Sequence, residues 1–157
     1  MPKENPLRGV AFFQGLDKAQ LEALTGALVF EEHPDGHVFA KAGRAGKREK
    51  DALHIVLEGR VAVSTKPKSA NQVPVARLMQ PGELFGLITF LKGGQRTATT
   101  AASGKVRVAS LTRERYEQVV RPNPALHSAL LFAIASQLAR DVRACNERLV
   151  KAIRKAE

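Results

Sequence analysis

The succession of short β-forming runs between residues 29 and 111 constrains this fold more than any other feature of the sequence. The runs read VFEE, HVFA, LHIVLE, RVAVS, VPVARLM, ELF, TATTAA and VRVASL, with turn signals containing Gly or Pro between them. Such residues reverse the chain, and Glu58-Gly59 predicts a tight hairpin between its two flanking runs. Short strands without alternating helices predict a sandwich, a jelly roll or a small barrel, and disfavour a doubly wound parallel sheet.

Helical patterns flank this β-rich zone on both sides. In residues 1–28, Asp17 is placed to cap a leucine-rich helix, and in residues 112–157, Thr112 can cap a short helix before the final one begins. A chain of 157 residues suits one domain with a sizeable core. We therefore expect a single domain, 1–157, that is mainly β with flanking helices.

The final helix has the pattern of a helix that pairs with another helix. Asn123 stands in the N-cap position before Pro124, and no Gly or Pro interrupts the chain from there to Glu157. Its apolar residues recur at steps of three or four: Leu130, Ile134, Leu138, Val142, Cys145, Leu149 and Ile153. A narrow apolar seam with charged flanks predicts a homodimer through this helix; the alternative is a helix packed wholly on its own sheet.

The charge balance and the single cysteine limit the classes of protein. Lys and Arg outnumber Asp and Glu by 25 to 15, a net charge of +10, which favours an anionic ligand or partner. Because Cys145 allows no internal disulfide, we expect a reducing, cytoplasmic setting. The N-terminus lacks a secretory signal pattern, and the longest apolar run, Ala129 to Ala135, is far too short for a membrane span.

Residues 81–102, PGELFGLITFLKGGQRTATTAA, hold the candidate binding site. Gly86 opens a short apolar turn, and the N–H groups at the start of such a turn suit a phosphate. Ten residues further on, Arg96 can donate to two phosphate oxygens, with the Thr97 hydroxyl beside it. An arginine beside Gly-Gly is, however, also typical of a solvated hairpin tip.

Three segments, in this order, resemble the cyclic nucleotide-binding domain family. FFQGLDKAQLEAL is similar to the family's opening helix, PDGHVFAKAGRAGKREKDALHIVLEGRVAVST to its glycine-punctuated strands, and LMQPGELFGLITFLKGGQRTATTAAS to its phosphate-binding cassette. The resemblance covers residues 12–150. It implies a β-jelly-roll (a double-stranded β-helix) with helices at both ends. It also implies a nucleotide pocket under the long C-terminal helix, as in catabolite-activator-like sensors.

The resemblance also implies roles for the cassette residues. Gly86 matches the family's glycine, and the backbone N–H groups after it, at Leu87 and Ile88, would meet a cyclic phosphate. Arg96 matches the arginine that pairs with this phosphate, and Thr97 its small hydroxyl neighbour. Leu87 departs from the pattern, because binding members usually carry there a Glu that accepts from the ribose 2′-hydroxyl. Loss of that acceptor costs about 1–3 kcal/mol, which weakens binding of cAMP or cGMP roughly 5- to 150-fold.

Residues at the base end of the ligand match less closely. Ala98, the small residue after Thr97, is a candidate for contact with the base. Cys145 and Asn146 roughly match a hydroxyl pair that touches the base in catabolite-activator-like members. Asn146 can read an adenine edge, or it is a polar residue beside the dimer seam. The family's transcription factors continue into a helix-turn-helix, whereas this chain ends at Glu157, so we expect a stand-alone sensor or a fragment of a longer protein.

We therefore expect a non-catalytic regulatory module that binds a cyclic nucleotide or a related phosphate ligand, such as a cyclic dinucleotide, and signals through a dimer helix. The downstream protein partner is not indicated. One alternative is a fold that has lost ligand binding and serves dimerisation or protein interaction. Another is a basic, nonspecific nucleic-acid binder, although stacking aromatics are scarce. Its basic patches, which are otherwise solvated charge, comprise Lys41, Arg44, Lys47, Arg48 and Lys50, and Arg140, Arg143, Arg148, Lys151, Arg154 and Lys155.

Catalytic constellations are not recognised. His33, His37 and His54, with Glu58, are the candidates for a cupin-like metal site, and their spacing does not give three convergent ligands. The sequence has neither a G-x-S-x-G motif nor a P-loop. We expect no catalytic residue, no metal, and no cofactor beyond the phosphate ligand.

Overall fold

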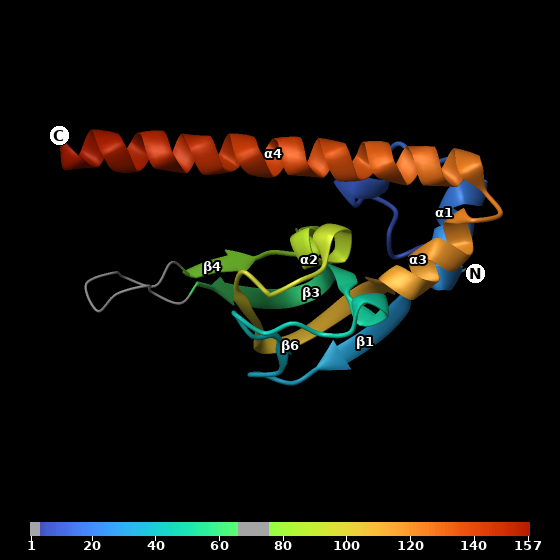
Figure 1. The fold of residues 1–157 in the computed structure, drawn as a ribbon, viewed down its shortest axis with the longest axis horizontal. Helices are drawn as coiled ribbons and strands as arrows, with labels where there is room; N and C mark the ends of the chain where they lie inside the picture. The colour runs from blue at the N-terminus through green and yellow to red at the C-terminus, as the bar shows by residue number, and fades with distance from the viewer. Residues whose placement is uncertain (1–3, 66–75) are drawn as a thin grey trace. The chain divides into compact units, whose positions relative to one another are not determined.

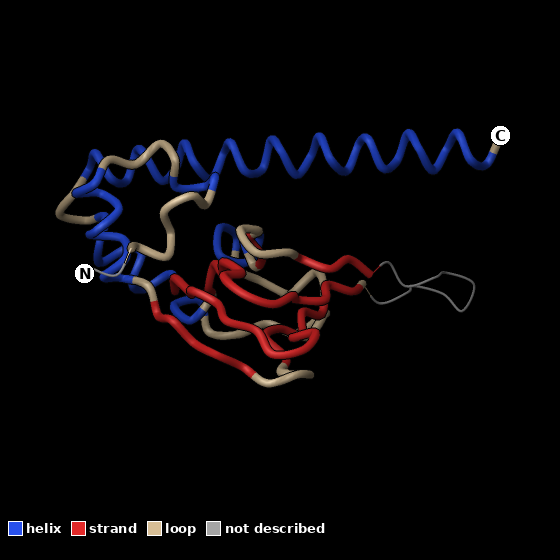
Figure 2. The backbone as a smooth tube through the Cα atoms, turned by 180° about the vertical axis from the view of Figure 1, so that it is seen from behind, coloured by secondary structure: helices blue, strands red, loops and turns tan. Residues whose placement is uncertain are grey.

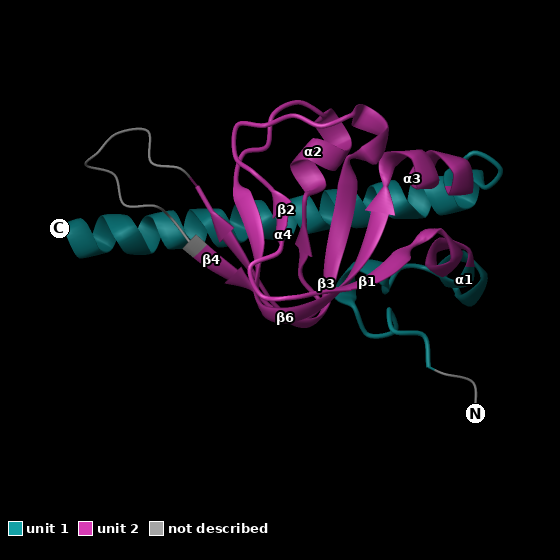
Figure 3. Ribbon diagram, turned by 90° about the horizontal axis from the view of Figure 1, so that it is seen from below, with its two compact units in different colours: residues 1–22, 120–157 teal, residues 23–119 magenta. Residues whose placement is uncertain are grey.

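The computed structural model describes residues 4–65 and 76–157. The chain forms two compact units, coloured separately in Figure 3. Residues 23–119 make up the first, here called the β unit. Residues 1–22 and 120–157 make up the second, called the helical unit.

Two long antiparallel strands, β3 (Ala52–Ser64) and β6 (Thr99–Thr112), form the centre of the β unit (Figure 1). Strands β1 (Val29–His33) and β2 (Val38–Ala40) pair with β6, and β4 (Ala76–Met79) and β5 (Leu84–Phe85) pair with β3. All of these pairings are antiparallel, and Figure 2 shows the strands curling into a roll. The predicted class, mainly β with flanking helices, is confirmed.

Short helices lie before, between and after these strands. The 3-10 helix η2 (Arg48–Lys50) precedes β3, the helix α2 (Leu87–Lys92) follows β5, and α3 (Arg113–Val120) follows β6. Inside the roll, Phe39 and Val63 pack against a buried apolar cluster. Its members are Val56, Val61, Met79, Phe85, Ala102, Val106 and Val108. Because this cluster draws on β3, β4, β5 and β6, it sets the register of the strands that carry the cassette.

The hairpin predicted at Glu58-Gly59 is wrong. The two flanking runs are halves of one strand, β3, whose register against β6 shifts around Glu58. Gly59 has a φ of 80°, and a Cβ placed on it would lie 2.3 Å from the carbonyl oxygen of Lys105. The glycine therefore permits a bulge and a close backbone approach, not a chain reversal. Residues 99–102 of TATTAA and the run VRVASL likewise belong to one strand, β6. Only residues 76–79 of VPVARLM are among those described.

The helical unit contains the N-terminal turn η1 (Ala11–Phe13) and the long helix α4 (Pro124–Ala156), which contact each other. The helix α1 (Lys18–Ala27) begins in this unit. The predicted helix starts at Asp17, Thr112 and Asn123 are confirmed by capping. Each of these side chains accepts the N–H of the residue three positions on, at 2.8, 3.2 and 3.0 Å. No helix of the described residues is long and apolar enough to cross a membrane.

The predicted seam along α4 is divided in two by the structure. Its first members, Leu130 and Ile134, are buried at 2% and 5% exposure, whereas Val142 and Leu149 are exposed at 59% and 58%. Leu131, one position on from Leu130, is 48% exposed and lies on the same side of the helix as Val142 and Leu149. This exposed apolar side of α4 is called the outer stripe. The N-terminal part of α4 therefore carries an inner and an outer apolar face, because successive positions differ by about 100° around a helix.

Candidate functional site

The predicted cassette lies within the β unit, between β5 and the start of β6. Gly86 is the N-cap of α2, with a φ of 80°, and a Cβ placed on it would lie 2.5 Å from the carbonyl oxygen of Ala52. Only glycine permits both the left-handed backbone and the approach of β3. Leu87 is buried and Ile88 is exposed. Phe90, fully buried, meets Tyr116 of α3 edge-to-face at 5.3 Å and anchors the turn.

Arg96 is held by a carboxylate that the sequence did not single out. Its Nη1 donates to Asp51 Oδ1 at 2.8 Å, and Asp51 is only 1% exposed. The backbone of Arg96 is also paired: its N–H donates to Arg44 and its carbonyl accepts from Gly43, both at 2.8 Å. Because the side chain of Arg96 is only 22% exposed, Arg96 is not a solvated hairpin tip.

A second arginine, Arg48, shares the same carboxylate. Its Nη1 donates to Asp51 Oδ2 at 3.2 Å. The guanidinium also donates to the carbonyl oxygens of Thr89, Phe90 and Leu91, at 3.0, 2.8 and 2.8 Å. The predicted basic loop is therefore more than solvated charge, although all its cations are exposed, including Arg48, whose side chain is 42% exposed. The available sequence signal was the Arg48-x-x-Asp51 spacing before β3, which has no meaning until the fold brings α2 beside it.

Three of the four histidines, His33, His37 and His54, lie close together in the β unit. His33 and His37 stack with ring centres 3.9 Å apart, and His54 stacks on Phe85 at 4.7 Å. Phe39 lies between them, with its ring centre 5.1, 4.9 and 5.6 Å from those of His33, His37 and His54. Among residues 4–65 and 76–157, no three His, Cys, Asp or Glu side chains are arranged to hold a metal ion.

Acidification is expected to destabilise the protein through His54. Burial lowers the pKa of His54 from 6.5 to about 4, with smaller contributions from Arg96 and His33. Between these two pKa values the unfolded chain binds a proton on His54 and the folded protein does not. The contribution of neutral His54 to the free energy of unfolding is therefore fully present above pH 6.5 and is lost as the pH falls toward 4. Between pH 7 and pH 5 this one group should lower the free energy of unfolding by about 2 kcal/mol.

Urea denaturation at the two pH values measures this loss. His54→Phe keeps a ring against Phe85 but cannot titrate, so its free energy of unfolding should change less between pH 7 and pH 5. It also removes the partner of Ser110 Oγ, which lies 2.7 Å from His54 Nδ1, so its stability at pH 7 should be lower. An equally steep loss in both proteins would contradict the assignment to His54.

The remaining predicted residues are divided between the units. Thr97 and Ala98 lie in the β unit, directly before β6, whereas Cys145 and Asn146 are exposed on α4 in the helical unit. Their contact with a base stays a prediction. Sequence reasoning missed Thr100, whose buried Oγ1 has no hydrogen-bond partner among the described residues. A buried hydroxyl of this kind is costly unless water or a ligand satisfies it.

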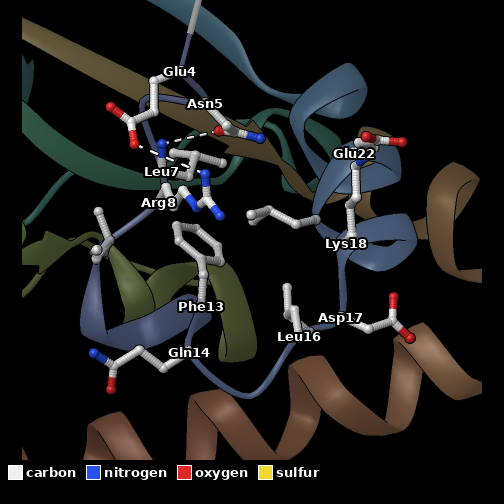
Figure 4. Close-up of a pocket in the computed structure, with 13 residues that line it drawn as sticks. Glu4, Asn5, Leu7, Arg8, Phe13, Gln14, Leu16, Asp17, Lys18 and Glu22 are labelled. Atoms are coloured by element: carbon white, nitrogen blue, oxygen red, sulfur yellow. Dashed lines mark hydrogen bonds and ion pairs between the residues drawn. The ribbon is translucent and has the colours of Figure 1, made fainter.

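A separate hollow of about 970 Å³ lies in the helical unit, lined by the N-terminal segment and the start of α1. Figure 4 shows the Phe13 ring next to the Arg8 side chain. Arg8 pairs with Glu4 at 3.8 Å, and the Leu7 N–H donates to Asn5 Oδ1 at 3.0 Å. None of the predicted site residues lines this hollow.

Comparison with known proteins agrees with this architecture. The chain belongs to the cyclic nucleotide-binding domain family, whose model matches residues 30–123. It is 26% identical over 134 residues to the CRP-like cAMP-activated global transcriptional regulator of Mycobacterium tuberculosis, covering 85% of this chain and 58% of that protein. This confirms the family that the sequence resembles.

Solved structures agree on the jelly-roll fold. The catabolite activator protein of Thermus thermophilus matches with a TM-score of 0.72 and 25% identity, over 90% of this chain and 62% of that one. A cyclic nucleotide-binding domain from Methylobacillus flagellatus matches with a TM-score of 0.77 and 20% identity, over 87% of this chain and 74% of that one. The chain thus spans less than two thirds of the mycobacterial regulator and of the Thermus protein.

Proposed function

We propose that this chain is a non-catalytic regulatory domain that binds a cyclic nucleotide or a related phosphate ligand at the cassette. The observation that carries the proposal is Arg96, a mostly buried guanidinium held in place by Asp51 beside a glycine-opened turn. The mycobacterial relative is named as cAMP-activated, which supports cAMP as the first candidate. The single cysteine of the present chain fits a reducing, cytoplasmic setting.

Arg96 retains donors for a phosphate while it keeps its partner. A guanidinium has five N–H groups, and the bond from Nη1 to Asp51 uses one of them. The others can take two phosphate oxygens in a fork, which is the strongest arrangement that an arginine offers an anion. The N–H groups of Leu87 and Ile88, with the Thr97 hydroxyl, would complete the phosphate contacts.

A thermal-shift panel tests this function directly. The ligands are cAMP, cGMP, cyclic dinucleotides, AMP and inorganic phosphate, each added to the purified protein. A ligand at 100 times its dissociation constant stabilises by about 2.7 kcal/mol, which is roughly 5–11 °C in Tm for a domain of this size. A shift from one cyclic nucleotide supports the proposal and identifies the signal. A flat panel at millimolar concentrations would leave a dimerisation module as the better reading.

Leu87→Glu is expected to tighten binding of cAMP about tenfold, because the carboxylate supplies an acceptor for the ribose 2′-hydroxyl. Glu83, the nearest earlier acid, is unsuited to this task, since it already accepts the Gln80 N–H at 2.6 Å and pairs with Arg77. The variant should also unfold at a lower temperature, because Leu87 is only 6% exposed.

Isothermal titration with cAMP and with 2′-deoxy-cAMP separates these two effects. The gain should be confined to cAMP, and the deoxy ligand should bind both proteins alike. Equal gains for the two ligands, or no gain for either, would show that the position after Gly86 does not meet the ribose.

We also propose a parallel homodimer through the outer stripe of α4. Leu131, Leu138 and Cys145 follow each other at intervals of seven, as do Ala135, Val142 and Leu149. A strict seven-residue repeat of apolar positions is the pattern of a two-stranded coiled coil. Exposure of Val142 and Leu149 at 59% and 58% leaves this stripe open to a second copy.

Cysteine cross-linking tests the dimer and its direction. In a parallel pair in register, the two copies of Cys145 face each other, so mild oxidation by copper phenanthroline should join them through a disulfide. Leu149→Glu should abolish the cross-link and give a monomer in sedimentation, whereas Lys155→Glu, near the end of the helix and off the stripe, should not. A wild-type monomer would contradict the dimer, and a dimer without the cross-link would contradict the parallel direction.

A further inference from the structure

Arg48 lies outside the predicted cassette, yet it binds the cassette helix. Its Nη1 donates to the carbonyl oxygens of Thr89 and Phe90, and its Nη2 to that of Leu91. These oxygens belong to the last turn of α2, whose carbonyls lack an N–H donor further along the helix. That of Thr89 is the exception, since it also accepts the N–H of the C-cap residue Gly93 at 2.7 Å. Three consecutive carbonyls are thus held by one guanidinium from a different segment of the chain, the 3-10 helix η2 before β3.

The end of α2 is built to admit this side chain. Gly93 is the C-cap of α2, with a φ of 68°. A Cβ placed on it would lie 3.0 Å from Arg48 Cδ and 3.3 Å from Arg48 Nε. Glycine therefore serves the left-handed backbone that ends the helix and also leaves space for the arginine.

The same guanidinium shares Asp51 with Arg96. Asp51 Oδ1 accepts from Arg96 at 2.8 Å, and Asp51 Oδ2 accepts from Arg48 at 3.2 Å. Asp51 is 1% exposed, so its charge must be balanced by protein groups and not by water. A bound phosphate would accept hydrogen bonds from Arg96. If this weakens the bond from Arg96 to Asp51, Arg48 remains as the second cation beside the carboxylate.

We propose that Arg48 is a positioning residue of the phosphate site, an inference that rests on the proposed function. It holds the C-terminal end of α2 and shares the charge of Asp51, so that Arg96 commits one N–H to this carboxylate and its others to a bound phosphate. Arg48 itself does not touch the ligand. Without it, Asp51 depends on Arg96 alone and draws more of the N–H groups of that side chain away from the phosphate.

The test compares Arg48→Ala with Lys47→Ala, a neighbouring exposed cation whose loss changes the net charge equally. Affinity for cAMP and cGMP is measured by isothermal titration at one salt concentration. Arg48→Ala should weaken binding at least tenfold, and Lys47→Ala should stay within twofold of wild type. Arg48→Lys keeps the charge near Asp51 but has fewer donors for the three carbonyls, so its affinity should lie between those of Arg48→Ala and wild type. If Arg48→Ala does not fold, Arg48→Lys carries the comparison. Binding within twofold of wild type in Arg48→Ala would overturn the proposal.

The double variant Arg48→Ala/Asp51→Asn separates this role from general stabilisation. Removing the carboxylate frees Arg96, so the double variant should recover most of the affinity that Arg48→Ala loses. If Arg48 only supported the fold, the second substitution would lower affinity further, and that result would also overturn the proposal.

Hydrogen exchange distinguishes failure of this inference from failure of the proposed function. Amides of residues 86–93 should exchange faster in ligand-free Arg48→Ala than in Lys47→Ala. Unchanged exchange would overturn the contact between Arg48 and α2 itself. If the wild-type protein binds no ligand of the thermal-shift panel while exchange responds as expected, the proposed function fails and the positioning role fails with it, but the contact stands.

Discussion

Arg96→Ala is expected to abolish binding of any phosphate-bearing ligand that the wild-type protein binds, with an affinity loss of at least about 100-fold. Two charge-assisted hydrogen bonds to the phosphate are lost, each contributing about 1.5–3 kcal/mol, and every 1.4 kcal/mol is a factor of ten. Isothermal titration with the cyclic nucleotide identified in the thermal-shift panel measures the change. Binding within twofold of wild type would show that the cassette is wrongly assigned.

Arg44→Ala is the matched control for this variant. Arg44 lies in the adjoining loop, is exposed, and loses the same charge, while its backbone contact with Arg96 remains possible. It should bind as wild type does. Melting without ligand checks folding: Arg96→Ala removes one partner of buried Asp51 but leaves Arg48 in place, so the protein should fold with a lower Tm.

Gly59→Ala is expected to destabilise the fold by about 3 kcal/mol or more, a fall of roughly 6–12 °C in Tm. The new Cβ would lie 2.3 Å from the carbonyl oxygen of Lys105 and 3.1 Å from the Cα of Val106. Because both are backbone atoms of the paired strand β6, relief requires the β3–β6 ladder to open. The left-handed backbone adds a further cost of about 1–2 kcal/mol for a residue with a Cβ.

Gly104→Ala isolates the steric part of this effect. Gly104 has nearly the same φ, 79°, but a Cβ placed on it meets nothing within 4 Å. Gly104→Ala should therefore lower the free energy of unfolding only by the cost of placing a Cβ on left-handed backbone. Thermal melts of the two variants measure the difference, and failure of Gly59→Ala to fold while Gly104→Ala folds would agree with the prediction. Equal Tm values would mean that β3 and β6 do not approach each other at the bulge.

The sequence predicted the elements of this fold well, because their signals are local. Asp17, Thr112 and Asn123 cap the helices where they were expected, since a cap acts on an N–H three positions away. The order of runs and turns, together with the family motifs, predicted an antiparallel roll. The cassette was predicted in the same way, because Gly86 and Arg96 lie within one short segment.

The errors arose where a local signal has two meanings. Glu58-Gly59 is equally compatible with a hairpin and with a bulge, and the choice depends on how closely Lys105 approaches, which is a property of a distant strand. The seam on α4 was predicted as one face. The structure divides it, because η1 packs against α4 and Leu130 is buried while Leu131 is exposed.

Local sequence was sufficient for most element types, the helix caps and the family, because each depends on residues close together in the chain or on their order. The tertiary structure alone decided what holds the cassette in place. Asp51 meets Arg96 across 45 positions, and Arg48 meets the carbonyls of α2 across 41 to 43. Charged side chains are common in loops, and only a fold that buries Asp51 away from water makes these two arginines its necessary partners.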